Sequence, residues 1–107
     1  MPKIPRQQLS EIVSIQEARD LTRNYRTRYR NDTKAHLFKK EDIEAILKQK
    51  NCVGIRMYYG INDLGQKSPV LIGVKENPNN YEDILGVAVD RGAPCPTQCD
   101  SSSPLMT

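Results

Sequence analysis

Aromatic residues are scarce in this sequence. The 107 residues include no tryptophan, one phenylalanine and five tyrosines, so a core must be built mainly from isoleucine, valine, leucine and tyrosine. Hydrophobic residues make up 37% of the chain, below the globular average of roughly 45–50%, which also counts glycine. A chain of this length and composition is expected to form one domain around one modest core.

Long apolar runs are also missing. No stretch approaches the ~18 residues that cross a bilayer, and the start of the chain, MPKIPRQQLSEIV, lacks the features of a secretory signal. We therefore expect no membrane partner and a cytoplasmic location, where thiols stay reduced. The cysteine count is three, and an odd number argues against a complete disulfide framework.

Common catalytic motifs are absent as well. The sequence has no glycine-rich phosphate loop, no paired histidine ligands and no serine nucleophile elbow. Its carboxylates are scattered, and none forms a recognisable general acid–base pair. These absences favour a protein that is not an enzyme, with no catalytic residues and no expected cofactor apart from the zinc ion considered below.

Hydrophobic periodicity divides the chain into segments. We expect a flexible lead-in at residues 1–13, a single α+β domain at 14–90, and a Pro/Ser-rich tail at 91–107 that folds back on the domain. Helical spacing and strand alternation predict the following elements: helices near 15–30 and 39–50, and strands near 52–60, 69–74 and 84–89. Ser14 and Glu17 form a capping box at the start of the first helix, whose apolar face includes Tyr25 and Tyr29. The apolar face of the second helix contains Ile43, Ile46 and Leu47. This order predicts an antiparallel three- to four-stranded sheet with two helices packed on one face and an irregular C-terminal tail.

Several stretches together resemble a known family. They are NYR at the end of the first helix, HLF before the second, CVGIRMYYGINDLGQKSPVLIGV in the hairpin, and PCPTQC followed by PL in the tail. From about residue 14 onward, this hairpin and Pro-Cys-Pro-x-x-Cys tail resemble a family of small uncharacterised proteins from Bacteroidota bacteria. The resemblance implies a soluble bacterial domain of unknown function with a shared tail, and it implies no activity.

Cys95 and Cys99 lie in the tail between prolines, and four interpretations are open. They can be free thiols that pack as small hydrophobes, the two ends of a disulfide, a reactive thiol pair, or half of a zinc site. Zinc needs four ligands, or three and a water, and Cys52 and the single histidine, His36, complete a Cys₃His set. A reducing cytosol favours packed free thiols.

A second candidate site is the arginine stripe, which comprises Arg19, Arg23, Arg26 and Arg30. On one helix these side chains lie within an arc of roughly 60° and can bind phosphate, RNA or an acidic protein. Residues 1–50 carry 12 Lys/Arg and 7 Asp/Glu, a net charge of +5. The isoelectric point of 8.8 is below that of dedicated nucleic-acid binders, so a solvated helix face is favoured and nucleic acid is not the expected partner.

A third candidate site lies on the first strand of the hairpin. Arg56 and Tyr58 alternate with Val53, Ile55 and Met57, so they face the opposite side of the sheet. If helices cover only one face, this pair lies on an open surface that a protein partner or a second copy of the chain can contact. The sequence therefore favours a small non-enzymatic interaction module. The alternatives are a zinc-binding or thiol-active protein and a weak anion or RNA binder.

Overall fold

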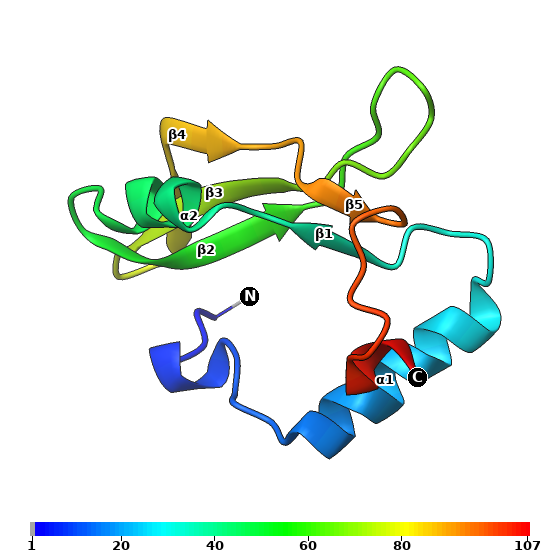
Figure 1. Cartoon of the computed structure of the whole chain (residues 1–107). Coiled ribbons are helices and arrows are strands. Elements are labelled where there is room, and N and C mark those ends of the chain that lie inside the picture. The colour runs from blue at the N-terminus through cyan, green and yellow to red at the C-terminus, as the bar shows by residue number, and fades with distance from the viewer. Residues whose placement is uncertain (1) are drawn as a thin grey trace. The chain divides into compact units, whose positions relative to one another are not determined.

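The computed structural model describes residues 2–107, which form an α+β structure (Figure 1). The α-helices are α1 (Ile15–Arg28) and α2 (Lys40–Leu47), and the short 3₁₀ turns are η1 (Arg6–Gln8) and η2 (Pro104–Met106). The strands are β1 (Ala35–Leu37), β2 (Cys52–Tyr58), β3 (Val70–Glu76), β4 (Tyr81–Val89) and β5 (Ala93–Cys95). Strands β2, β3 and β4 form an antiparallel sheet in that order, and β1 pairs with β5. The predicted class and the three-stranded antiparallel sheet are confirmed.

The chain clusters into two compact units. Unit 1 contains His36–Ala93 with Pro2 and Lys3, and unit 2 contains Ile4–Ala35 with Pro94–Thr107. In this grouping, the C-terminal segment from Pro94 onward belongs with the first part of the chain. Helix α2 packs on the sheet in unit 1, whereas α1 packs with η2 in unit 2. Periodicity shows which face of a helix is apolar, but not which segment covers it.

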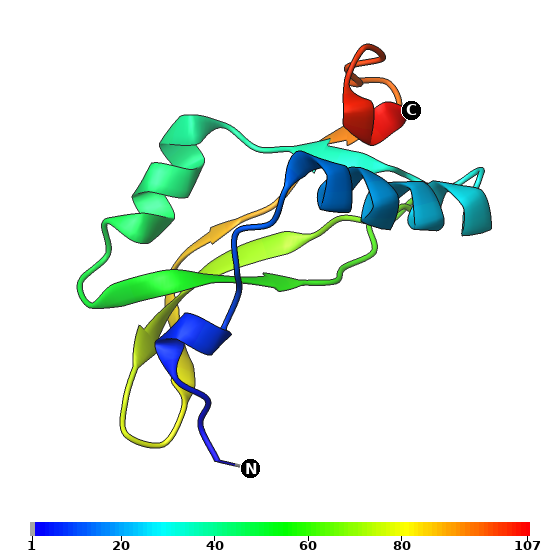
Figure 2. The same cartoon turned by 90° about the horizontal axis from the view of Figure 1, so that it is seen from below.

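The core of unit 1 lies between α2 and the sheet, whose ribbons Figure 2 shows from a second direction. Ile46 on α2 is fully buried against Leu71 and Val89, and half-buried apolar side chains surround these three. Gly73 allows this close approach, because a Cβ there would lie 3.1 Å from Ile46 Cγ2. The predicted apolar face of α2 is confirmed for Ile46 and for the partly buried Ile43, and it is wrong for Leu47, which is 48% exposed.

The two outer strands of the sheet differ in regularity. Along β3, Ile72 pairs with Ala88 on β4 but the next residue, Gly73, pairs with Ile84, so residues 85–87 bulge out of register. Strand β2 has an irregularity only at its start and is then paired continuously from Gly54 to Tyr58. A bulge bends a strand and interrupts its outer edge, so β2 has the more regular edge of the two.

Helix α1 begins as its sequence predicts and ends earlier. The Ser14 hydroxyl accepts a hydrogen bond from the Glu17 amide at 3.0 Å, which caps the first turn. The helix ends at Arg28, because Tyr29 has φ −122° and ψ 64°, outside the helical region. No helix within residues 2–107 is long and apolar enough to span a membrane.

Candidate functional site

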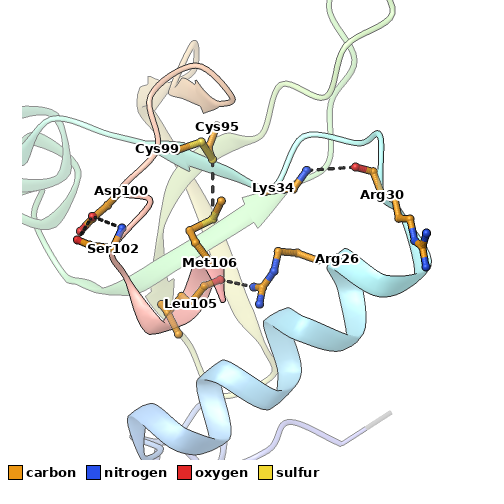
Figure 3. The surroundings of a disulfide bond; sticks show 9 residues. All are labelled: Arg26, Arg30, Lys34, Cys95, Cys99, Asp100, Ser102, Leu105 and Met106. Carbon is orange, nitrogen blue, oxygen red and sulfur yellow. Dashed lines mark hydrogen bonds between the residues drawn. A yellow bond between two sulfur atoms is a disulfide. The ribbon is translucent and has the colours of Figure 1, made fainter.

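Cys95 and Cys99 form a disulfide in unit 2 (Figure 3). The Gln98 amide donates to the Pro94 carbonyl at 2.8 Å, and this turn brings the two cysteine Cα atoms to 4.9 Å, within the range of disulfides. Cys95 is buried, whereas Cys99 is exposed. The prediction of free thiols is therefore wrong for this pair, because the local turn places the sulfurs together regardless of the inferred compartment.

The predicted zinc ligands do not assemble. Cys52 is a free cysteine whose thiol lies 3.3 Å from the Gly54 carbonyl, and His36 Nε2 lies 3.1 Å from the Lys67 carbonyl. Throughout residues 2–107, no group of three or more His, Cys, Asp or Glu side chains is placed to hold a metal ion. The remaining two predicted ligands, Cys95 and Cys99, are joined to each other.

The arginine stripe separates into different environments. Arg26 donates to the Leu105 carbonyl, and Arg23 donates to the main-chain oxygen of Thr107 at 3.4 Å. Arg19 is half-buried. Arg30 lies beyond the end of α1, and Figure 3 shows its side chain pointing away from the tail. The prediction of four arginines on one helix is wrong for Arg30, because α1 ends at Arg28.

The tail around the disulfide is held by short-range contacts. The Asp100 carboxylate accepts hydrogen bonds from the Ser102 hydroxyl at 2.7 Å and the Ser102 amide at 3.1 Å, which together lower the Asp100 pKa. Ser103 Oγ caps η2 by accepting from the Leu105 amide at 3.1 Å. Met106 Sδ lies 4.0 Å from Cys95 Sγ. A disulfide sulfur carries no proton, so this last approach is a van der Waals contact.

Arg56 and Tyr58 share one carboxylate. Both side chains donate to Asp83 on β4, and Arg56 also donates to the Tyr81 carbonyl at 3.0 Å. The three side chains lie on one face of the sheet, since Val74 of β3 pairs with Gly54 on one side and Asp83 on the other. The predicted positions on a common face are correct, but Asp83 was missed because the third strand was expected to begin one residue after it.

The hydrogen bond between Tyr58 and Asp83 predicts how the stability of the protein changes at high pH. The hydrogen bond to Asp83 is the largest cause of a raised Tyr58 pKa, because it stabilises the neutral phenol. The raised folded-state pKa gives stability that is present below the ordinary value of 10.0 and is lost as pH rises through the folded pKa. A spectrophotometric titration should show one late phenolate transition that Tyr58→Phe removes and Asp83→Ala shifts downward. A late transition that persists in Tyr58→Phe would contradict this assignment.

Exposed apolar side chains concentrate on β2 and the loop that follows it. We call them the β2–loop patch, and its members are Ile55, Met57, Tyr58, Tyr59, Ile61 and Leu64, each at least 37% exposed. Figure 1 shows the loop projecting beyond the ends of the strands. Sequence reasoning identified a hairpin loop here but missed the surface. The available signal was Ile61 and Leu64, two large apolar residues in an otherwise polar turn.

Polar groups fix the shape of this loop. Asn62 Oδ1 accepts from the amides of Leu64 and Gln66, both at 2.9 Å, and the Ser68 amide donates to the Gly60 carbonyl at 2.8 Å. The apolar side chains therefore extend from a backbone that hydrogen bonds hold in place.

No protein-family model, curated protein or solved structure matches this chain.

Proposed function

We propose that the protein is a non-enzymatic binding module that takes an extended, apolar segment of a polypeptide along β2 and the loop at residues 59–69. The observation that carries this proposal is the concentration of six large, exposed apolar side chains within residues 55–64. Ile55 and Met57 lie on one face of β2, Tyr58 lies on the other, and the remaining three side chains belong to the loop side of the strand. Exposed apolar side chains concentrated in this way usually mark an interaction site. Aromatic residues and methionine are also enriched at protein interfaces, and this patch contains Met57, Tyr58 and Tyr59.

The outer edge of β2 supports an extended partner. Within the described residues β2 pairs only with β3, so its other edge carries no strand. Sheets usually protect such edges with proline, lysine or a bulge. Strand β2 has no proline or lysine, and its one irregularity lies at its start, between Cys52 and Gly54. Its one charged side chain, Arg56, binds Asp83 on the sheet face. An added strand would gain main-chain hydrogen bonds from this edge and side-chain contacts from the patch.

The bulge in β4 argues for β2 as the preferred edge. Residues 85–87 interrupt the register at the opposite side of the sheet, so an added strand cannot pair continuously there. The partner strand belongs to another protein or to a second copy of this chain. Sedimentation equilibrium across a wide concentration range distinguishes these two sources before any ligand is added.

The test uses two variants of matched chemistry. Ile61→Asp/Leu64→Asp changes the patch, and Leu85→Asp changes an equally exposed leucine, 84% accessible, on the bulge of β4. Binding is measured by self-association or, for a monomer, against a library of extended apolar peptides. We expect the patch variant to weaken binding by at least about tenfold, whereas Leu85→Asp should leave it unchanged.

Amide exchange locates the bound segment independently. A strand added to β2 should slow exchange at alternate residues of Cys52–Tyr58, because only every second amide points to the outer edge. Equal loss of binding in the patch variant and in Leu85→Asp would contradict the proposal. Protection that falls on β4 rather than β2 would also contradict it.

A further inference from the structure

Two arginines of α1, Arg23 and Arg26, donate to the C-terminal segment, but the segment does not satisfy all the donors of the arginines on this side of the helix. Arg26 Nη1 donates to the Leu105 carbonyl, while the 3.4 Å separation between Arg23 Nη2 and the Thr107 oxygen is long for a hydrogen bond. Arg19 Nε and Arg26 Nη2 are buried and have no acceptor among the described residues. A buried charged donor without an acceptor is costly, so the main-chain oxygens of the tail are an incomplete ligand for this face.

An oxyanion supplies the acceptors that the tail lacks. The three arginines follow one another at spacings of four and three residues, which places them on one side of α1. A phosphate offers several charged oxygens, and the planar fork of a guanidinium can bind two of them at once. We propose that Arg19, Arg23 and Arg26 form a phosphate-binding face that the chain's own C-terminal segment occupies, and that the Cys95–Cys99 disulfide holds this segment in place until a dithiol reduces it.

The position of the disulfide fits this role of holding the C-terminal segment in place. The Cys95 carbonyl accepts from the Lys34 amide at 2.7 Å, so one end of the disulfide belongs to a paired strand, β5. Cys99 at the other end immediately precedes the Asp100 turn, and η2 begins four residues after Asp100, at Pro104. Met106 of η2 lies against Cys95 Sγ (Figure 3). The covalent link therefore limits how far η2 can move from α1.

The two sulfur atoms of the disulfide differ in solvent accessibility, and this difference decides which of them a reductant attacks first. A thiolate of the dithiol attacks the exposed Cys99 Sγ, the S–S bond breaks, and the Cys95 sulfur leaves with the bonding pair and then takes a proton. The second thiolate of the reductant attacks its own sulfur in the mixed disulfide and expels Cys99 as a thiolate, which is also protonated. The protein gains two thiols, and the reductant becomes a cyclic disulfide. The tail is then held by non-covalent contacts alone.

The first experiment measures release of the tail. Air-oxidised wild type, dithiothreitol-reduced wild type and Cys99→Ser are compared by amide exchange at Leu105 and Met106. Opening the loop restores conformational freedom to residues 95–99, so we expect exchange at least about tenfold faster in the reduced and Cys99→Ser proteins. Cys52→Ser removes the free cysteine and should behave as wild type in both redox states. Unchanged amide exchange at Leu105 and Met106 after reduction would overturn the proposal that the disulfide holds the C-terminal segment in place.

The second experiment measures the anion site in the intact chain. Inorganic phosphate is titrated at constant ionic strength, balanced with chloride, while NMR follows the arginine Nε–H signals. We expect phosphate to bind about tenfold more tightly after reduction, because the tail no longer competes. Arg23→Gln/Arg26→Gln should remove this binding, and Arg30→Gln, beyond the end of α1, should not. Equal phosphate affinity in the oxidised and reduced proteins would overturn the proposal that the C-terminal segment covers the phosphate-binding face. This outcome would leave the proposed binding module standing, because no residue of the β2–loop patch is changed.

Discussion

Ile46→Ala is expected to lower the free energy of unfolding by about 3 kcal/mol. Ile46 is fully buried between α2 and the sheet, where it packs with Leu71 and Val89. The residue beneath it is Gly73, which has no side chain to move into the cavity that the substitution leaves. The described part of the chain buries few hydrophobic side chains, so this single loss is large relative to the total stability of a small domain.

The adjacent residue provides the control. Leu47 is 48% exposed, and Leu47→Ala should lower the unfolding free energy by less than about 1 kcal/mol. Urea unfolding followed by circular dichroism measures both variants, and an unchanged dependence on urea shows that the comparison concerns stability alone. Similar losses in the two variants would show that the contact between α2 and the sheet does not form the core.

Gly60→Ala is expected to disturb the proposed binding loop. A Cβ at residue 60 would lie 2.5 Å from the carbonyl oxygen of Ser68, and a backbone atom cannot move aside as a flexible side chain can. The same two residues close the hairpin, since the Ser68 amide donates to the Gly60 carbonyl at 2.8 Å. We expect a loss of about 1–3 kcal/mol in unfolding free energy, faster exchange at the Ser68 amide, and weaker partner binding.

Gly54→Ala is the matched substitution in the same hairpin. Its Cβ would meet only Val74 Cγ2, at the ordinary contact distance of 3.8 Å. This variant should keep its stability within about 0.5 kcal/mol of wild type and retain the loop structure. A Gly60→Ala protein with wild-type stability and normal Ser68 exchange would show that the hairpin accommodates the added methyl group, and that the loop is less constrained than its hydrogen bonds indicate.

Local elements were predictable from short-range patterns. The spacing between Ser14 and Glu17 identified the start of α1, and the alternation from Val53 to Met57 identified β2. Both signals act over a few residues, because caps and side-chain alternation depend on the immediate backbone. The end of α1 was placed two residues too late, since the helical spacing of Tyr25 and Tyr29 continues past the point where the backbone leaves the helix.

The candidate sites were less predictable than the elements. Arg56 and Tyr58 were correctly placed on one face, but their partner Asp83 depends on the register of β4. That register includes a bulge at residues 85–87, and the alternation of apolar and polar residues along the strand does not predict a bulge. The disulfide was one of several open readings, and the inferred reducing compartment was given more weight than the turn that joins Cys95 to Cys99.

The sequence by itself determined the helix start at Ser14, the burial of Ile46 on α2 and the strand alternation in β2, because each depends on residues within about one helical turn. The order of these local elements along the chain then determined the class of the fold. Only the tertiary structure decided that η2 packs against α1, that Asp83 joins Arg56 to Tyr58, and that the apolar side chains of the β2–loop patch are exposed. These features join or uncover residues that are distant along the chain. They depend on how whole surfaces fit together, and no local propensity specifies such a fit.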